Sequence, residues 1–283
     1  MFKIKSLESI GILFAIAAYL SFSILDVMQK TAVIHHSIFQ LLFIKYFFTL
    51  FLSYLESRRK KNYTFFKSKN FKLQFIRSIL SLIESACFVL SFRYLTLADA
   101  HSIASLTPII IVALSSIILR EKVSLKIWIA ICIGFIGVLI IMRPGLSIFD
   151  SKSLIPLVAA FFLSFYQIVT RKVSEYDSTE TSLFYTSVIG ILLMSLFAYF
   201  FWQPLQTFSY VLFLGIGIFF SIGIYFQIIA LSKARASIVQ PFHYTLIFWA
   251  IILGYIFYGD FPDKYTIIGA LIITISGIYV LKK

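Results

Sequence analysis

Charged residues are scarce in this chain of 283 residues. Asp, Glu, Lys and Arg make up 13% of it and hydrophobic residues 60%, whereas a typical soluble domain is about a quarter charged. No polar stretch is long enough to form a second, soluble domain. The composition therefore favours a protein whose solvent is mostly lipid.

Cysteine is almost absent as well. Cys87 and Cys132 both fall inside apolar runs and provide neither a disulfide framework nor a metal cluster, so we interpret them as small core side chains. His35 and His36 do not form a metal pair, because adjacent residues on a helix point apart. The sequence predicts no metal site and no cofactor.

Catalytic and nucleotide-binding motifs are also missing. The chain has no nucleophile-elbow glycine pattern and no glycine-rich phosphate loop. Without a nucleotide-binding loop ATP is not the direct source of energy, and we predict that the protein is not an enzyme. A polytopic membrane enzyme and an assembly protein without transport activity stay open as alternatives.

Acidic residues are outnumbered by basic ones, 12 against 25, which gives a net charge of +13. The basic residues stand in short clusters between apolar runs, a distribution that argues against nucleic-acid binding. The apolar runs have the length of about 20 residues that crosses a bilayer as a helix. The ten predicted spans are 10–30, 36–56, 72–95, 101–119, 125–143, 153–172, 180–200, 207–230, 236–258 and 264–281.

The basic clusters predict how the chain lies in the membrane. With the N-terminus in the cytoplasm most of them fall on the cytoplasmic side, as the positive-inside rule requires. The densest cluster, Arg58-Arg-Lys-Lys61, lies in the longest connector. An even number of spans returns the C-terminus to the same side. The fold class is therefore predicted as an all-α integral membrane protein with ten transmembrane helices.

One pattern of residues occurs twice, over 98–121 and again over 234–260. Each copy has small residues, a proline within an apolar run, and an acid at the far end. Ten spans divide into five and five, and an odd number of spans turns the second half upside down relative to the first. We therefore predict two inverted five-helix repeats, 1–145 and 146–283.

The motifs within these halves follow a definite order. Thr107-Pro108, Arg120-Glu-Lys122 and Gly134-Phe-Ile-Gly137 stand in the first half, and Pro241-Phe-His-Tyr-Thr245 in the second. Together they resemble the drug/metabolite transporter superfamily, in its bacterial ten-helix branch with two EamA-type repeats. The resemblance spans nearly the whole chain and implies a multi-pass carrier of the bacterial inner membrane.

Within that superfamily the chain is most similar to the branch that includes S-adenosylmethionine uptake carriers. The likeness rests on Asp26-Val-Met-Gln-Lys30, Arg77 and the segment Phe261-Pro-Asp-Lys264. Lys45 stands where that branch usually has arginine. Glu84 stands where a small or apolar residue is expected.

Four ionisable residues are predicted at bilayer depth, where a charge is costly and is by default a functional hypothesis. Asp26 and Glu84 would attract a cationic or zwitterionic substrate or carry a coupling proton, and Lys45 would meet a carboxylate or hold Glu84 charged. The structural alternative is a permanent Lys45–Glu84 bridge, with Asp26 paired to Lys30 four residues later. Arg77 is predicted nearer the cytoplasmic face, in a gating or structural role.

Prolines and aromatic residues mark the other side of the predicted site. Pro108 and Pro241 free backbone groups inside spans, which lipid tolerates only where a helix is buried or lines a cavity. Passive kinks and interhelical hydrogen bonds are the structural alternatives. The remaining predicted substrate-binding residues are Tyr166, Gln167, Tyr225, His243, Tyr244 and Trp249, of which Trp249 would stack on a planar substrate or a cation.

Taken together, these features predict a secondary-active transporter that works by alternating access. Its substrate is expected to be a small polar organic metabolite that is amine-bearing or zwitterionic, with S-adenosylmethionine or an amino-acid-like compound as the leading candidate. A proton or an exchanged metabolite would be the coupled species. Membrane lipid is the expected surrounding, and the chain is expected to be a monomer or weak dimer.

Overall fold

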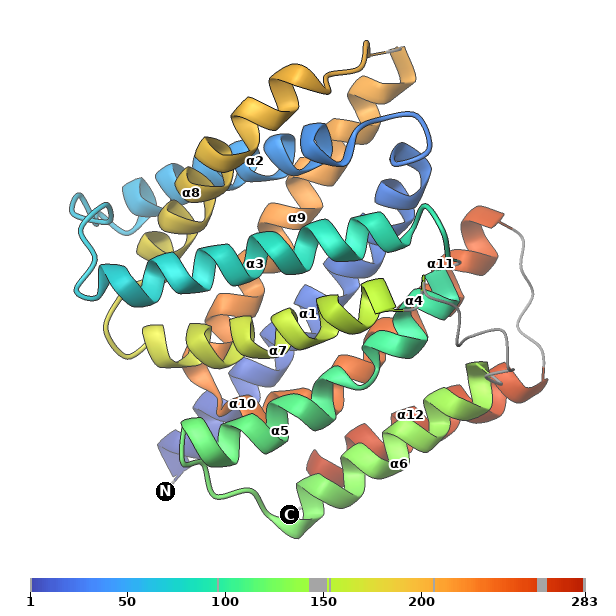
Figure 1. Cartoon of the computed structure of the whole chain (residues 1–283). Helices are drawn as coiled ribbons and strands as arrows, with labels where there is room; N and C mark the ends of the chain where they lie inside the picture. The colour runs from blue at the N-terminus through green and yellow to red at the C-terminus, as the bar shows by residue number, and fades with distance from the viewer. Residues whose placement is uncertain are drawn as a thin grey trace.

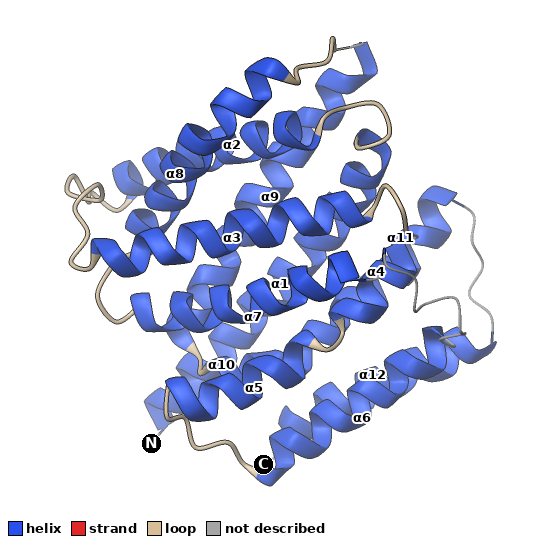
Figure 2. Cartoon of the chain, viewed as in Figure 1, coloured by secondary structure: helices blue, strands red, loops and turns tan. Residues whose placement is uncertain are grey.

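The regular secondary structure of the described residues is entirely helical, and loops join the helices (Figure 2). The computed structural model describes residues 2–95, 97–142, 152, 154–205, 207–258 and 264–281. The predicted repeat boundary at 145/146 and the motif residues 259–263 lie outside them. The helices are α1 Phe2–Ala32, α2 Ile38–Arg59, α3 Phe71–Ser91, α4 Leu97–Ala104, α5 Thr107–Ile118, α6 Leu125–Met142, α7 Leu154–Val173, α8 Thr179–Phe200, α9 Thr207–Lys233, α10 Ala236–Val239, the 3₁₀ helix η3 Gln240–Tyr244, α11 Thr245–Tyr258 and α12 Lys264–Leu281.

Six of these helices are long and apolar enough to cross a membrane. Four of them, α2, α3, α7 and α8, have 20 to 22 residues, close to the length that spans a hydrocarbon core. The helices α1 and α9 are longer, and α5 and the first part of α6 are shorter apolar helices. The protein is a multi-pass integral membrane protein.

The two prolines of the repeated pattern do not lie within continuous helices. The expected span 101–119 is divided into α4 and α5, and Pro108 occupies the first turn of α5. The expected span 236–258 is divided into α10, η3 and α11, and Pro241 lies in the first turn of η3. Proline lacks an N–H and is tolerated in a first helical turn, where no partner is required. Both halves therefore contain a discontinuous helical segment at the expected position.

The two halves of the chain pack against each other helix by helix. The helix α1 lies along α9, α3 along α7, α2 along α8 and α6 along α12. In Figure 1 the α6–α12 pair lies at one edge of the bundle, and the start of α1 and the end of α12 point to the same end. A core with members on α1, α2, α3 and α9 fills the interior between them.

Small residues bring the paired helices close together. Gly190 of α8 faces the ring of Tyr46 of α2, and a Cβ at that position would collide with the ring. Gly11 of α1 faces Ala234 in the same way. Such contacts matter in a membrane, where lipid tails compete equally well for apolar side chains and close packing provides much of the attraction.

Candidate substrate cavity

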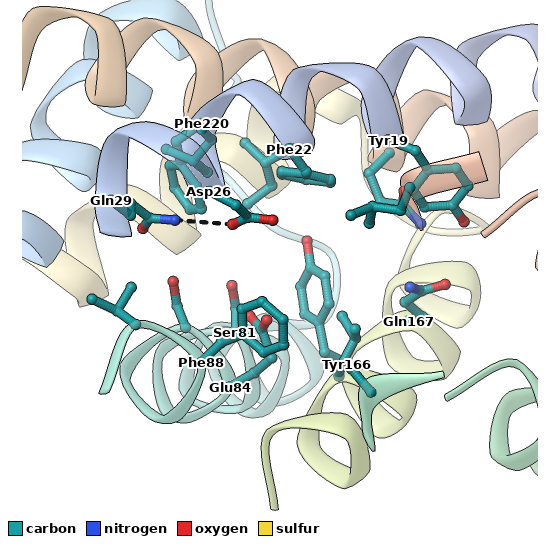
Figure 3. Close-up of a pocket in the computed structure, with 18 of the residues that line it drawn as sticks. Tyr19, Phe22, Asp26, Gln29, Ser81, Glu84, Phe88, Tyr166, Gln167 and Phe220 are labelled. Carbon is teal, nitrogen blue, oxygen red and sulfur yellow. Dashed lines mark hydrogen bonds between the residues drawn. The ribbon is translucent and has the colours of Figure 1, made fainter. Parts of the chain in front are cut away.

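A cavity lies in the middle of the bundle, between α1, α2, α3, α4, α7, α9, η3 and α11. The cavity has a volume of about 100 Å³. This volume has room for several water molecules or for part of a small ligand. Its apolar lining includes Phe22, Phe88 and Phe220 (Figure 3). Its polar lining is Tyr19, Asp26, Gln29, Lys45, Ser81, Glu84, Ser85, His101, Tyr166, Gln167, Gln227 and His243.

A chain of polar contacts ties four helices together along one wall of the cavity. Asp26 Oδ2 lies 3.2 Å from His101 Nε2, and Gln29 donates to Asp26 Oδ1 over 3.2 Å. Lys45 Nζ donates to Gln29 Oε1 over 2.9 Å and to Ser85 Oγ over 2.5 Å. The contacts connect α4, α1, α2 and α3, so this wall is held in place by its own polar groups.

Lys45 is the most deeply buried member of this chain, with 1% of its side chain exposed. Besides its two hydrogen bonds, its ammonium group lies 4.4 Å from the ring centroid of Phe220. An ammonium group has three donors, and these contacts use most of its capacity. Lys45 is therefore committed to holding α1, α2 and α3 together.

The predicted Lys45–Glu84 bridge is absent from the described residues, within which no ion pair joins the two side chains. Lys45 contacts Gln29 and Ser85 instead. Glu84 lines the cavity, is only partly buried, and has no hydrogen bond or ion pair to a described residue. Its carboxylate is therefore available to a ligand.

The alternative pairing of Asp26 with Lys30 is also replaced. Asp26 turns into the cavity toward His101, with 6% of its surface exposed. Lys30 donates to the backbone carbonyl of Leu95 over 3.2 Å. The i,i+4 spacing predicts proximity on the helix surface, but the polar cavity offers Asp26 a closer partner than the helix rim does.

The opposite wall comes from the second half of the chain and is neutral or aromatic. Gln167 Oε1 accepts a hydrogen bond from Gln240 over 2.9 Å, and the ring of His243 stands edge-on to Tyr19 with centroids 5.1 Å apart. The Tyr166 hydroxyl and both amide atoms of Gln227 are buried without a hydrogen-bond partner in the described structure. Of the predicted residues, the cavity thus brings together Asp26, Lys45, Glu84, Tyr166, Gln167 and His243.

Arg77 lies outside the cavity lining and is fully buried. Its guanidinium donates to Gln74, to the carbonyl of Ser182 and to the Thr186 hydroxyl, and it lies 5.7 Å from the ring centroid of Tyr166. These contacts join α3 to α8 and place a positive charge behind one cavity residue.

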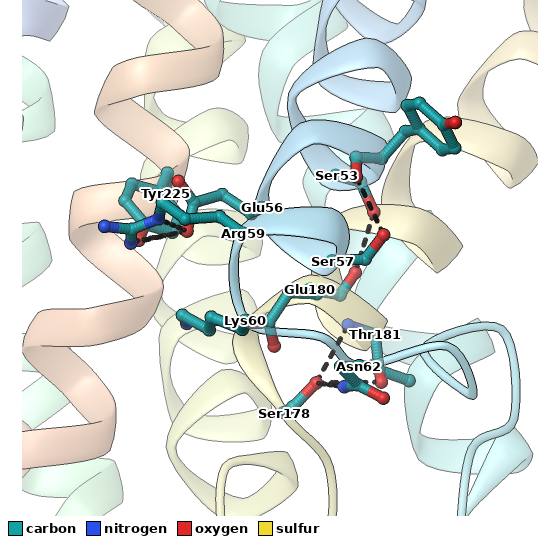
Figure 4. A network of polar contacts seen from close by, with 11 residues as sticks. Ser53, Glu56, Ser57, Arg59, Lys60, Asn62, Ser178, Glu180, Thr181 and Tyr225 are labelled. Atoms are coloured by element: carbon teal, nitrogen blue, oxygen red, sulfur yellow. Dashed lines mark hydrogen bonds and ion pairs between the residues drawn. The ribbon is translucent and has the colours of Figure 1, made fainter.

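Tyr225 also lies outside the lining, in a polar network between α2, α8 and α9 (Figure 4). Its hydroxyl donates to Glu56 over 2.9 Å, and Arg59 contacts the same carboxylate over 2.7 Å. In the same network Lys60 pairs with Glu180 over 2.5 Å. The network connects the ends of three helices beside a basic connector.

Two further predicted residues face away from the cavity lining. Tyr244 is buried, and its hydroxyl donates to the carbonyl of Ile131 in α6 over 3.3 Å. Trp249 in α11 packs against Phe248 with ring centroids 5.3 Å apart. The Tyr244 contact joins η3 to α6, whereas the Trp249 contact lies within α11.

Six polar lining residues were not among the predicted substrate-binding residues: Tyr19, Gln29, Ser81, Ser85, His101 and Gln227. Spacing on α1 would have found two of them, because Gln29 lies three residues after Asp26 and Tyr19 seven before it, all on one helical face. His101 is an ionisable residue inside an apolar run, which is itself a functional signal in a membrane. No group of three or more His, Cys, Asp or Glu within the described residues is arranged to hold a metal ion.

The EamA-like transporter family matches two segments of the chain, residues 9–143 and 152–282. The chain belongs to the EamA-like transporter family. The resemblance found in the sequence motifs is thereby confirmed. The two matches fall in the first and the second half and together cover nearly all of it.

Several named transporters are similar to this EamA protein. The "S-adenosylmethionine uptake transporter" of Rickettsia prowazekii is 23% identical over 276 residues, 96% of this chain and 92% of the relative. The "Riboflavin transporter" of Vibrio cholerae is 28% identical over 212 residues, 74% of this chain and 71% of the relative. The "Pseudopaline exporter CntI" of Pseudomonas aeruginosa is 23% identical and covers 94% of both chains.

The fold also has a counterpart among solved crystal structures. One such chain superposes with a TM-score of 0.78 over 97% of this chain and 96% of the other, at 14% sequence identity. The arrangement of helices is therefore shared at a level where the residues have largely diverged.

Proposed function

We infer that this EamA protein is a secondary-active transporter of a small polar metabolite that carries an amine or another cationic group. The Glu84 carboxylate carries the proposal. It lines a cavity in the middle of the bundle and makes no hydrogen bond or ion pair with a described residue. The Lys45 ammonium acts electrostatically on both Glu84 and Asp26, and a cationic substrate supplies a second positive charge for the two carboxylates.

The charge of the lining favours a cation over a neutral or anionic compound. The lining holds two carboxylates, those of Asp26 and Glu84, against a single ammonium group, that of Lys45, so its carboxylates outnumber its lysine and arginine side chains. S-adenosylmethionine has a sulfonium and an amino-acid group and fits this balance. An amino-acid-like amine is the next candidate. The uncharged riboflavin ring system would bring no positive charge to the second carboxylate of the lining.

The pairing of helices supports an inverted repeat with ten spans. If the second half repeats the first upside down, α7 corresponds to α1 and α9 to α3. The observed α1–α9 and α3–α7 interfaces are then two symmetry-related copies of the same helix pairing. An inverted repeat of this kind has two mirror-related states and so a route to alternating access.

The proposed carrier lies in the bacterial inner membrane with both termini in the cytoplasm, because this orientation keeps most basic residues inside. A proton or an exchanged metabolite drives transport, and the carrier works as a monomer or weak dimer. The two halves, 1–145 and 146–283, rock about the cavity between them.

Counterflow in liposomes tests the proposal. Purified full-length protein is reconstituted in vesicles loaded with unlabelled S-adenosylmethionine, and entry of labelled compound is followed. The expected result is trans-stimulated entry that Glu84→Gln lowers roughly 10–100-fold. Failure to exchange any compound in a broad panel of amines, amino acids and flavins would reject the proposal in favour of a membrane enzyme or an assembly protein.

A further inference from the structure

The cavity has two chemically different ends, seven residues apart on each of two helices. On α1, Asp26 and Tyr19 are separated by two turns, about 10 Å along the axis. On α9, Phe220 and Gln227 have the same separation. Phe220 lies beside Lys45 and so belongs to the end that contains Asp26. Figure 3 shows Tyr19 and Asp26 well apart, with Tyr166 between them.

The end formed by Tyr19 and Gln227, here called the amide end, is buried but unsatisfied. Tyr19 is 1% exposed and Gln227 2% exposed, and both line the cavity. The Tyr19 hydroxyl and the Gln227 amide lie close enough to interact weakly, but neither makes a hydrogen bond of ordinary geometry to a described residue. The Tyr166 hydroxyl, between the two ends, lies near Arg77 and Thr170 but also makes no hydrogen bond of ordinary geometry. Buried polar groups in native proteins nearly always have a partner, so these groups require a ligand or water.

The free groups define the chemistry of their partner. A glutamine amide offers a donor and an acceptor side by side, and a tyrosine hydroxyl offers one of each. This set matches a neutral group with an adjacent donor and acceptor, such as a carboxamide or the edge of a nitrogen heterocycle. A carboxylate fits less well, since the amide oxygen would face it without a proton.

We propose that Gln227, with the Tyr19 and Tyr166 hydroxyls, recognises a neutral hydrogen-bonding head group on a substrate whose cationic part lies at Glu84 and Asp26. The proposal rests on the transport function inferred above and narrows its substrate class. The substrate is an extended molecule with a cation and a polar neutral head about 10 Å apart, a distance set by two helical turns. Small amines without such a head bind at one end only.

A matched pair of glutamines separates ligand recognition from structure. Gln40 is also fully buried, but it lies outside the cavity and is doubly bonded to the backbone of residue 203, over 3.0 Å and 3.3 Å. Gln227→Met removes unpaired polar atoms at little cost in volume, whereas Gln40→Met breaks two hydrogen bonds. We expect Gln227→Met to raise the melting temperature of the substrate-free protein by about 2 °C or more, and Gln40→Met to lower it.

Two sulfonium compounds provide the transport test. S-adenosylmethionine and S-methylmethionine share the cation and the amino-acid group, and only the first has a heterocyclic head. Gln227→Met in reconstituted vesicles is expected to raise the KM for S-adenosylmethionine about tenfold, the loss of roughly one hydrogen bond, and to leave S-methylmethionine unchanged. Gln40→Met is expected to change neither KM.

The melting temperatures and the KM values together decide whether Gln227 binds substrate or has a structural role. A fall in melting temperature for Gln227→Met like that for Gln40→Met would overturn the proposal, since Gln227 would then be structural. An equal change of KM for both sulfonium compounds would overturn it as well. If the wild type exchanges neither compound, the proposed function fails for this class of cation, whereas the melting temperatures still decide for or against a free amide end.

Discussion

The two walls of the cavity differ in their charge and in how many of their polar groups are paired. The first-half wall, formed by Asp26, Gln29, Lys45, Glu84 and His101, carries both carboxylates and the ammonium group, and most of its polar groups contact one another. The second-half wall, formed by Tyr166, Gln167, Phe220, Gln227 and His243, has no Asp, Glu, Lys or Arg, and several of its polar atoms are unpaired.

The difference indicates that the two walls have different roles. Helix pairing is nearly symmetric between the halves, but the chemistry is not. A connected, charged wall fixes the helices around it, and a neutral wall with spare donors and acceptors adapts to what binds. Substitutions that exchange the properties of the two walls therefore give the sharpest tests.

The largest effect is expected when the first-half wall loses its cation. Lys45→Met removes the group that joins Gln29 to Ser85 and leaves two carboxylates without compensation. Loss of one member of a buried charged set costs about 3–5 kcal/mol. The melting temperature of the purified protein should fall sharply. Gln227→Met, a change of similar size on the second-half wall, is the control and should not lower the melting temperature. An equal fall in melting temperature for both variants would contradict the proposed difference between the two walls.

Removal of the free carboxylate should instead affect transport more than stability. Glu84→Gln retains the shape but not the charge, and a hydrogen bond to a charged group contributes about 1.5–3 kcal/mol, or roughly 10–100-fold in uptake. Since Glu84 makes no hydrogen bond or ion pair to a described residue and interacts with Lys45 only electrostatically, the melting temperature should fall much less than for Lys45→Met. Glu84→Asp, which retains the charge, should preserve part of the uptake. Full activity of Glu84→Gln would contradict a role in substrate binding.

The sequence was sufficient to predict an all-helical, multi-pass membrane protein of the EamA type. Long apolar runs and charged residues at depth are strong signals, because each is costly in the wrong solvent. Asp26, Lys45 and Glu84 therefore stood out without a structure, and all three line one cavity.

Pairing within the site was harder to predict. Sequence spacing favoured Asp26 with Lys30 and adjacency of spans favoured Lys45 with Glu84, but His101 and Gln29 are the partners formed. These contacts depend on how far helices rotate about their axes, which short-range spacing does not encode. Tyr225 shows the same limit, since it lies two residues from Gln227 but on another helical face, beside Glu56.

A smaller effect is expected in the network around Tyr225. Tyr225→Phe removes the hydrogen bond donated to Glu56 and the one accepted from Arg59, each worth about 0.5–1.5 kcal/mol. Because Tyr225 lies outside the cavity lining, the KM for S-adenosylmethionine should not change, while the melting temperature falls slightly. A large rise in KM with an unchanged melting temperature would instead assign Tyr225 to the substrate.

The smallest effect is expected at Trp249, which stacking chemistry alone would place at a planar substrate. Its ring packs on Phe248 and does not line the cavity, so Trp249→Phe preserves an aromatic contact and should change stability by less than about 0.5 kcal/mol. Uptake of S-adenosylmethionine and S-methylmethionine should be equally unaffected. If only the compound with the planar head were transported less well, Trp249 would contact that head in another step of the cycle, and the second-half wall would extend into α11.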